Sequence, residues 1–466
     1  MNIFFEKLHL YTKEGEKTTI NFSHTLTFIY GNMGVGKTTL LNLIFYCLGG
    51  TLIKTPAVEQ CLNDTQLEMI INEYRYSFYR KINSNTVIVE DRERKYKIVM
   101  PYNQISQFIL KKCELPSKTI VFSGSGNSNI EKKVDLSFIN FSWFSYLKQL
   151  EMDNIFFNLN SDNIYKKTAA INVLSTFFDC EDMQDGERNE KRRRMRIQAR
   201  QYQESERVFE YLEGIFTDSV KEIYEEEYLN NTINNIYREK SLFNIDEVKQ
   251  LMNIQSELVG IKFYKDFSQK REKCRLKLYD LQEQLKNERM LISKLNLSNS
   301  SNSRRFCQLF LECLLNVDFP GVTIRDEVRL EESTFMPIIF NSYTGKEVSF
   351  FNLGSGGKKT IFKICYALAI HRYHHEKKGE NYLPSFFIID TPMKNISERE
   401  DKLRYDSFYQ YIFELFSSEL IDTQLIIIEK ELRDLSEYKL KDAAIIKHMT
   451  NNEPMNPPLF KNYRGY

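Results

Sequence analysis

The chain has 466 residues, of which 42% are hydrophobic and 27% charged, and its formal net charge is +1. This composition is typical of a globular protein with two or three units, and the near-zero charge excludes a global field that would draw the chain to nucleic acid or to a membrane. No apolar run reaches 18 residues and no secretory signal is visible at the start, so we expect a cytoplasmic protein with no membrane partner. The eight cysteines form no C-x-x-C pair, which indicates reduced thiols and excludes the common zinc spacing.

Residues 1–182 are predicted to mix strands and helices. Segments 1–12 and 17–31 are expected as strands, and the second leads into a glycine-rich loop. Apolar and polar residues alternate through 67–82 and 85–101, as they do in hairpin strands with one buried face.

The loop GNMGVGKT, residues 31–38, fits the pattern G-x-x-x-x-G-K-[ST] and lies between an apolar strand and an amphipathic helix. Its glycines allow successive backbone N–H groups to point at phosphate oxygens, and the following helix offers its N-terminal dipole to the same anion. Lys37 is expected to reach the β and γ phosphates of ATP, and Thr38 to ligate Mg²⁺. The residues expected to bind the nucleotide here are Gly31, Asn32, Gly34, Gly36, Lys37, Thr38 and Thr39.

Residues 183–300 are predicted to be helical, with few glycines and many charges. Apolar residues recur every seven positions in two arms, which favours an antiparallel coiled-coil hairpin. These positions are Met195, Tyr202, Phe209, Phe216 and Ile223 in the first arm, and Leu278, Leu285 and Ile292 in the second. A compact helical subdomain is the alternative. Six basic residues within 191–200 could contact DNA phosphates, or form a solvated face balanced by nearby acids.

Residues 301–466 return to strands and helices. The apolar run Phe386–Ile389 is predicted to be a buried parallel strand, with Asp390 at its carboxyl end as a second Mg²⁺ ligand. Ser355, Gly356 and Gly357 precede an amphipathic helix and would give its N-terminus free N–H groups and a hydroxyl for a second phosphate contact.

These motifs together resemble the ABC-type ATPases of the SMC, RecF, RecN and SbcC group. NLGSGGKK, residues 352–359, resembles their signature, with one extra residue, and FIIDTPMKNIS, residues 387–397, resembles their Walker B strand and D-loop. The resemblance implies an α/β P-loop ATPase head, made of the Walker A half at 1–182 and the signature half at 301–466, with the helical insertion at 183–300 between them. It also implies that Gln149, in a Q-loop, faces Mg²⁺ and the attacking water.

Two departures from the family pattern affect the chemistry. The glutamate that usually follows the Walker B aspartate, and activates water, is Thr391 here, so we expect slow ATP hydrolysis. Glu429, after the next strand, is the candidate for a displaced base, and a surface carboxylate is the alternative. The expected catalytic set is therefore Lys37, Gln149, Asp390 and Glu429, with Thr38, Gln149 and Asp390 at the metal.

The resemblance implies that two copies, or a higher oligomer, sandwich ATP between Lys37 of one chain and Ser355 of another. It suggests a switch or sensor in bacterial anti-phage defence that binds DNA or a foreign protein and controls a separate effector. A DNA-end repair ATPase and a non-hydrolysing scaffold are the alternatives. Two other segments have a less specific pattern: His371 and His375 would form a metal site or an exposed helix end, and the tail at 456–466 would dock a partner or fray.

Overall fold

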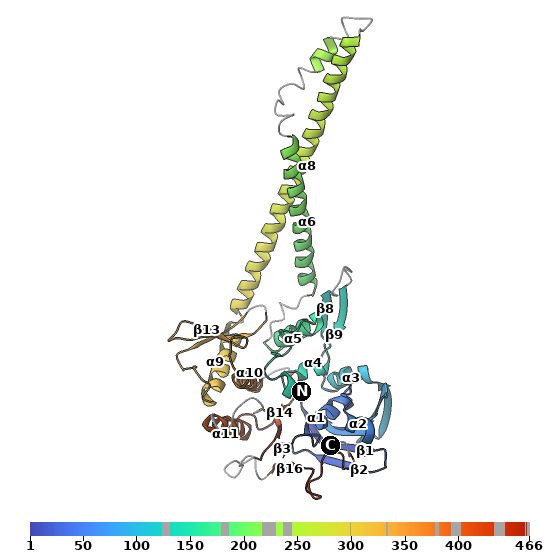
Figure 1. Ribbon diagram of the computed structural model, residues 1–466, viewed down its shortest axis with the longest axis vertical. Coiled ribbons are helices and arrows are strands. Elements are labelled where there is room, and N and C mark those ends of the chain that lie inside the picture. Colours follow the sequence, from blue (N-terminus) through green and yellow to red (C-terminus); the bar gives the residue numbers. More distant parts are fainter. Residues whose placement is uncertain are drawn as a thin grey trace. The chain divides into compact units, whose positions relative to one another are not determined.

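The computed structural model describes residues 1–123, 131–178, 186–216, 230–235, 245–298, 300–331, 334–377, 382–392, 402–432, 443–461 and 463. The chain divides into two compact units, Met1–Gln184 with Asn299–Tyr466, and Asp185–Ser298. Figure 1 shows the elements of both units along the chain. In the described part of the chain, no helix combines the length and the apolar character needed to cross a membrane.

A five-stranded parallel sheet forms the centre of the first unit and contains strands from both ends of the chain. In order these are β10 (Tyr146–Leu147), β14 (Phe386–Asp390), β15 (Gln424–Glu429), β3 (Leu26–Gly31) and β16 (Ile445–Met449). β14 and β15 are buried along their whole length, as expected for apolar strands covered on both faces. Because all neighbours are parallel, their carboxyl ends meet at one edge of the sheet.

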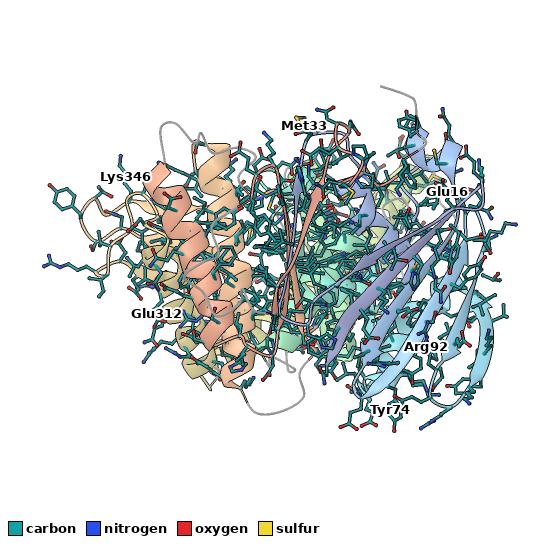
Figure 2. The ribbon with its side chains drawn as sticks, turned by 90° about the horizontal axis from the view of Figure 1, so that it is seen from below. Glu16, Met33, Tyr74, Arg92, Glu312 and Lys346 are labelled. Atoms are coloured by element: carbon teal, nitrogen blue, oxygen red, sulfur yellow. The ribbon has the colours of Figure 1, made fainter. Side chains whose placement is uncertain are left out.

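A six-stranded antiparallel sheet lies beside it, in the order β2 (Lys17–Asn21), β1 (Ile3–Thr12), β4 (Leu62–Ile71), β5 (Tyr74–Lys81), β6 (Thr86–Asp91) and β7 (Tyr96–Pro101). The hairpins predicted from the alternation in 67–101 are confirmed, and Asn72, with a φ of 54°, makes the turn between β4 and β5. Figure 2 shows the parallel sheet between this antiparallel sheet and a layer of helices, with Met33 of the glycine-rich loop near one edge.

Helices and small sheets complete the first unit. The helices are α1 (Lys37–Cys47), α2 (Pro56–Cys61), η1 (Tyr102–Gln104), α3 (Ile105–Lys112), α4 (Phe138–Ser142), η2 (Gln149–Glu151), α5 (Ile164–Phe177), α9 (Ser300–Asn316), α10 (Gly356–Glu376) and α11 (Lys402–Ser418). The strands are β8 (Thr119–Ser123) with β9 (Glu131–Asp135), and β11 (Glu327–Leu330), β12 (Pro337–Phe340) and β13 (Glu347–Ser349). α9 packs against α10 through aromatic rings, for example Phe310 and Phe362 at 5.1 Å.

The second unit contains the long helices α6 (Gly186–Phe216) and α8 (Ile245–Ser298), which pack together. The rings of Phe209 and Phe267 are 5.1 Å apart, and the Lys277 ammonium lies 5.7 Å from the Tyr202 ring. Later positions on α6 meet earlier positions on α8, so the helices are antiparallel. Of the expected heptad residues, Met195 and Leu278 are buried and Leu285 is partly buried. Phe216, Ile223 and Ile292 lie outside the described side chains, and coiled-coil packing stays a prediction.

Candidate nucleotide site

The glycine-rich loop leaves β3 at Gly31 and enters α1 at Lys37, and it has no room for side chains at two of its glycines. Gly31 has a φ of 143°, and a Cβ there would lie 1.8 Å from the Met449 carbonyl oxygen. Gly36 has a φ of 94°, and its Cβ would lie 2.6 Å from the Cβ of Leu459. Positive φ values and this close approach both require glycine, so the predicted curled loop is present.

Lys37 is the cation inside this loop. Its side chain is only 9% exposed, and Nζ donates hydrogen bonds to the carbonyl oxygens of Gly31 at 2.6 Å and Asn32 at 2.7 Å. Burial lowers the pKa of Lys37, while the carboxylates of Glu429 and Asp390 oppose that shift. The loop therefore holds a partly desolvated ammonium, which gains more from an arriving phosphate than a hydrated one would.

Asp390 ends β14 at the same edge of the sheet and is 0% exposed. Its Oδ1 accepts hydrogen bonds from the hydroxyls of Thr38, at 3.3 Å, and Thr391, at 3.1 Å. Its Oδ2 is buried and has no hydrogen-bond partner among the described residues. Burial raises the pKa of Asp390, against the opposing effects of the two hydroxyls and of Lys37.

This arrangement fits Mg²⁺, which prefers oxygen ligands and usually takes only one or two from the protein beside substrate phosphates. The Oδ2 atom of Asp390 lacks a partner that a cation would supply, and the Thr38 hydroxyl lies against the same carboxylate. No cluster of three or more His, Cys, Asp or Glu side chains occurs in the parts of the chain that the structure describes. An all-protein metal cage is therefore not what these described residues form.

Thr391, the residue after Asp390, has its polar groups turned inward. Its Oγ1 donates to Asp390, and its backbone N–H donates to the Ile428 carbonyl at 2.8 Å. Its φ is 54°, an uncommon value for a β-branched residue, which costs roughly 1–3 kcal/mol. A hydroxyl held against a carboxylate in a strained backbone is not a base for water.

Glu429 ends β15 and is 2% exposed, so the alternative that it is a surface carboxylate is wrong. Its Oε2 accepts from the Tyr409 hydroxyl at 3.0 Å, and its Oε1 from the Lys430 backbone N–H at 2.8 Å. The negative charge of Glu429 acts on Lys37 and favours the protonated form of its ammonium group. A role as displaced base stays a prediction.

A cavity of about 270 Å³ opens beside these residues. Its lining includes loop residues 33–39, together with Gln149 and Thr391. Gln149 begins η2, two residues after β10, and its backbone amide favours the ionised form of Asp390. The structure thus brings the four expected catalytic residues, Lys37, Gln149, Asp390 and Glu429, to one edge of the parallel sheet, where Lys37 and Gln149 line the cavity.

Ser355, by contrast, is not among the residues that line this cavity. It caps α10, accepting a hydrogen bond from the Lys358 backbone N–H at 3.2 Å, and it is exposed. Gly356 and Gly357 form the first turn of the helix behind it. The expected D-loop, residues 394–397, lies outside the described residues.

The model of the AAA_23 family, an AAA domain, matches residues 6–304. The chain belongs to this family. The match confirms the predicted resemblance to the ATPases of the SMC and RecF group, and it implies nucleotide binding, use of Mg²⁺ and ATP hydrolysis as the family's chemistry.

Three solved structures are similar to this AAA-domain chain. One is an Smc head domain with an extended coiled coil bound to the C-terminal domain of ScpA, from Pyrococcus furiosus, with 14% identity, a TM-score of 0.45, and coverage of 96% of this chain and 93% of that one. A second, an Smc head with a coiled coil and joint from Pyrococcus yayanosii, has 16% identity, a TM-score of 0.41, and coverage of 96% and 95%. A third, an SmcHead bound to the C-winged helix domain of ScpA, has 14% identity, a TM-score of 0.44, and coverage of 96% and 95%.

Two segments of this AAA-domain chain differ from expectation. His375, in the last turn of α10, is exposed as expected, but His371 is not. His371 is buried, its Nε2 lies 3.1 Å from the Ser145 hydroxyl, and burial lowers its pKa to about 3. The described part of the tail packs on the chain's own glycine loop, where the Leu459 N–H donates to the Val35 carbonyl at 2.9 Å. The apolar residues Leu459 and Phe460, after two prolines, indicated that the tail docks on a surface. The sequence did not show that this surface is the chain's own glycine loop.

Proposed function

We propose that this protein is an ATP-dependent dimerising switch. Mg²⁺ and ATP bind at the loop 31–38 of one copy, and the exposed N-terminus of α10 in a second copy contacts the γ phosphate. The supporting observation is that Ser355 is exposed and does not line the cavity that contains Lys37. An anion-binding helix end left outside its own nucleotide cavity is suited to complete the site of another copy.

Within one copy, each residue has a defined task. Backbone N–H groups of the loop and the Lys37 ammonium bind the phosphates, and the Thr38 hydroxyl with the Asp390 carboxylate hold the metal. Mg²⁺, when bound, neutralises phosphate charge. Gln149 orients water at the cavity edge. Binding energy is used to bring two chains together, since ATP then has a higher affinity for the closed dimer than for the open monomer.

Hydrolysis in this proposal is slow. Thr391 cannot accept a proton near neutral pH, and its hydroxyl donates to Asp390. Glu429 is the remaining carboxylate for a base, although both of its oxygens already accept hydrogen bonds. A long-lived ATP state suits a sensor that signals while assembled, and it is unsuited to a fast motor.

The setting we propose is bacterial anti-phage defence, in which the ATP-assembled form recognises DNA or a foreign protein and controls a separate effector. Its support is the family resemblance of the motifs. The basic run 191–200, on α6, is the candidate DNA contact. A repair ATPase acting on DNA ends would instead show brisk hydrolysis stimulated by DNA, and a scaffold would bind ATP with no turnover.

The test is the molar mass of the protein by light scattering, with Mg²⁺ and either ATP or no nucleotide. ATP is expected to double the mass of the native protein, and to leave Lys37→Ala and Ser355→Arg monomeric. Tyr343→Arg, at a side chain that is 95% exposed on the β12–β13 hairpin, is the matched control and should dimerise.

Mixing the two defective variants gives a sharper result. A dimer of Lys37→Ala with Ser355→Arg contains one site with both native halves, so the mixture should assemble with ATP when neither variant alone does. Failure of the mixture to assemble, with native protein dimeric, would reject the sandwich. A native protein that binds ATP and stays monomeric would reject the switch.

A further inference from the structure

Apart from Gln149 and Thr391, the residues lining the nucleotide cavity fall into two chemical groups. The first is the phosphate-binding group, loop residues 33–39 with Lys430, and carries positive charge and backbone N–H groups. The second contains no charged residue and consists of Thr55, Pro56 and Ala57, at the start of α2, with Asn451, Pro458, Phe460 and Tyr463. This second group is called the base wall below.

We propose that the base wall binds the purine ring of the nucleotide, and that the C-terminal segment supplies the stacking surface through Tyr463, supported by Phe460. This inference rests on the proposed nucleotide site and adds to it the element that selects the base. A ligand whose triphosphate lies in the loop 31–38 has its base at the other part of the same cavity. An uncharged wall with two aromatic residues suits a flat heteroaromatic ring.

The C-terminal segment is fixed to the phosphate loop by specific contacts. The Leu459 N–H donates to the Val35 carbonyl at 2.9 Å. Leu459 is buried, and the contact with Gly36 is so close that a Cβ on that glycine would lie 2.6 Å from the Leu459 Cβ. Because Phe460 follows directly, its position depends on this docking, and the aromatic residues keep a set distance from the phosphate-binding N–H groups.

Phe460 and Tyr463 have different degrees of burial, which indicates different tasks. Phe460 is 5% exposed and belongs to the main hydrophobic core. Tyr463 is half-buried and lines the cavity, and its N–H donates to the Phe460 carbonyl at 3.3 Å. Phe460 is thus the support, and Tyr463, which is only partly buried and lines the cavity, is the candidate for stacking on a ligand.

The part of the base wall at the start of α2 is also set by local structure. The Thr55 hydroxyl caps α2, accepting a hydrogen bond from the Val58 N–H at 3.3 Å, and Pro56 fixes the first helical turn. Because this side is held by its own cap, binding of a base does not require it to be ordered first. The affinity gained from stacking is then not lost in ordering the wall.

Titration calorimetry with Mg²⁺ separates base binding from phosphate binding when ATP and inorganic tripolyphosphate are compared. Tyr463→Ala is expected to weaken ATP roughly tenfold and to leave tripolyphosphate within about twofold. Tyr463→Phe keeps the ring and should bind ATP as the native protein does. Lys37→Ala should lose both ligands, because it acts on the phosphates.

Two results would overturn the inference: native ATP affinity in Tyr463→Ala, or an equal loss of ATP and tripolyphosphate, which would mean that the tail only supports the loop. Phe460→Leu, which keeps apolar volume and removes the ring, should weaken ATP more than tripolyphosphate if the protein stays folded by its unfolding midpoint. A native protein that binds neither ligand would reject the proposed nucleotide site itself. If the native protein binds ATP but does not dimerise, the proposed switch is rejected, and the proposed binding of the purine ring at the base wall is not.

Discussion

Replacing Asp390 by asparagine should stabilise the protein without ligand and destabilise it, relative to native, with ligand. Asp390 is 0% exposed, and its Oδ2 has no hydrogen-bond partner among the described residues. An unsatisfied buried polar atom costs about 1–3 kcal/mol, and its charge adds to that cost. Asparagine keeps an oxygen for the hydroxyls of Thr38 and Thr391, but its amide N–H groups need acceptors. We therefore expect a net gain of about 1 kcal/mol, or a rise of roughly 2 °C in melting temperature.

With magnesium and ATP, the native protein should be more stable than Asp390→Asn. At a ligand concentration about 100 times Kd, the native protein gains about 2.7 kcal/mol of stability. Asp390→Asn loses a metal-binding carboxylate and should gain less than about 1 kcal/mol under the same conditions. The measurement is the melting temperature of both proteins in EDTA and in Mg²⁺ with ATP, and the curves of stability against ligand should cross.

Asp326 provides the matched control, because it is a buried aspartate with the opposite environment. It is 4% exposed, and its carboxylate accepts from the backbone N–H groups of Ser342 at 2.7 Å and Thr323 at 2.8 Å. Burial alone would raise its pKa, but these N–H groups outweigh it and hold the pKa of Asp326 below the usual value. Asp326→Asn should therefore destabilise by about 1–3 kcal/mol, equally with and without ligand.

The pH dependence has opposite signs for the two carboxylates. The pKa of Asp390 is raised by burial, so the folded state holds its proton longer than the unfolded state, and this residue makes the protein less stable as pH rises above about 4. Asp326, with a lowered pKa, stabilises above that value, and its contribution is lost as pH falls. If Asp390→Asn melts below native in EDTA, or gains as much from Mg²⁺ and ATP, the reasoning about its unpartnered oxygen is refuted.

Three other predictions concern catalysis, packing and acid stability. Thr391→Ala should change phosphate release by less than about threefold. Glu429→Gln should lower it by about 10²–10⁴ if Glu429 is the displaced base, and a loss of less than about tenfold would reject that role. Arg372→Met should lower the free energy of unfolding in urea by about 2–3 kcal/mol, less than the roughly 3–5 kcal/mol of a fully buried ion pair, because the glutamate partners of Arg372 can rehydrate. Arg305→Met removes an exposed ion pair and should cost about 0–1 kcal/mol. Equal losses in the two variants would contradict this reasoning. Burial lowers the pKa of His374 to about 3, so the stability of the protein falls below pH 6.5, where the unfolded state takes up a proton that the folded state does not. Between pH 6.5 and 5, His374→Phe should lose about 2 kcal/mol less free energy of unfolding than the native protein. The same dependence of stability on pH in both proteins would reject the lowered pKa of His374.

The main parts of the candidate site could be predicted because each depends on local sequence and one rule of sheet topology. The glycine loop follows a recognisable strand, and Asp390 ends another. Thr38, at the end of the glycine loop, and Asp390 are hydrogen-bonded although 352 residues separate them in the sequence. They meet because parallel strands place their carboxyl ends at one edge of the sheet. The prediction needed only that both strands belong to one parallel sheet, which their apolar runs indicate.

The surroundings of α10 could not be predicted in the same way. Polar residues on this helix suggest an exposed face, but Lys363 and His371 are buried because distant segments supply their partners. Lys363 Nζ donates to the carbonyl oxygens of Glu151, at 2.6 Å, and Ile155, at 2.7 Å, and His371 meets Ser145. A helical pattern reports which side chains are polar, and it does not report which long-range acceptors are present.

The tail was missed for a related physical reason. Its docking depends on the close approach of Leu459 to Gly36, which has a positive φ and no side chain. No periodic pattern in the sequence indicates such an approach. Leu459 is placed by a backbone hydrogen bond to Val35, which any residue type except proline could make at that position. Composition alone therefore could not separate docking on a partner from docking on the chain's own loop.

Several unfavourable features of the folded protein lie at one edge of the parallel sheet, and they support the proposal of a ligand-driven switch. Burial disfavours the charged forms of both Lys37 and Asp390, and Thr391 has a strained backbone beside them. Phosphates would satisfy the ammonium, and a divalent cation would satisfy the carboxylate, so ligand binding removes costs that the free protein carries. A site with this balance has a large difference in free energy between its free and bound states, and that difference is what can be used to hold two copies together.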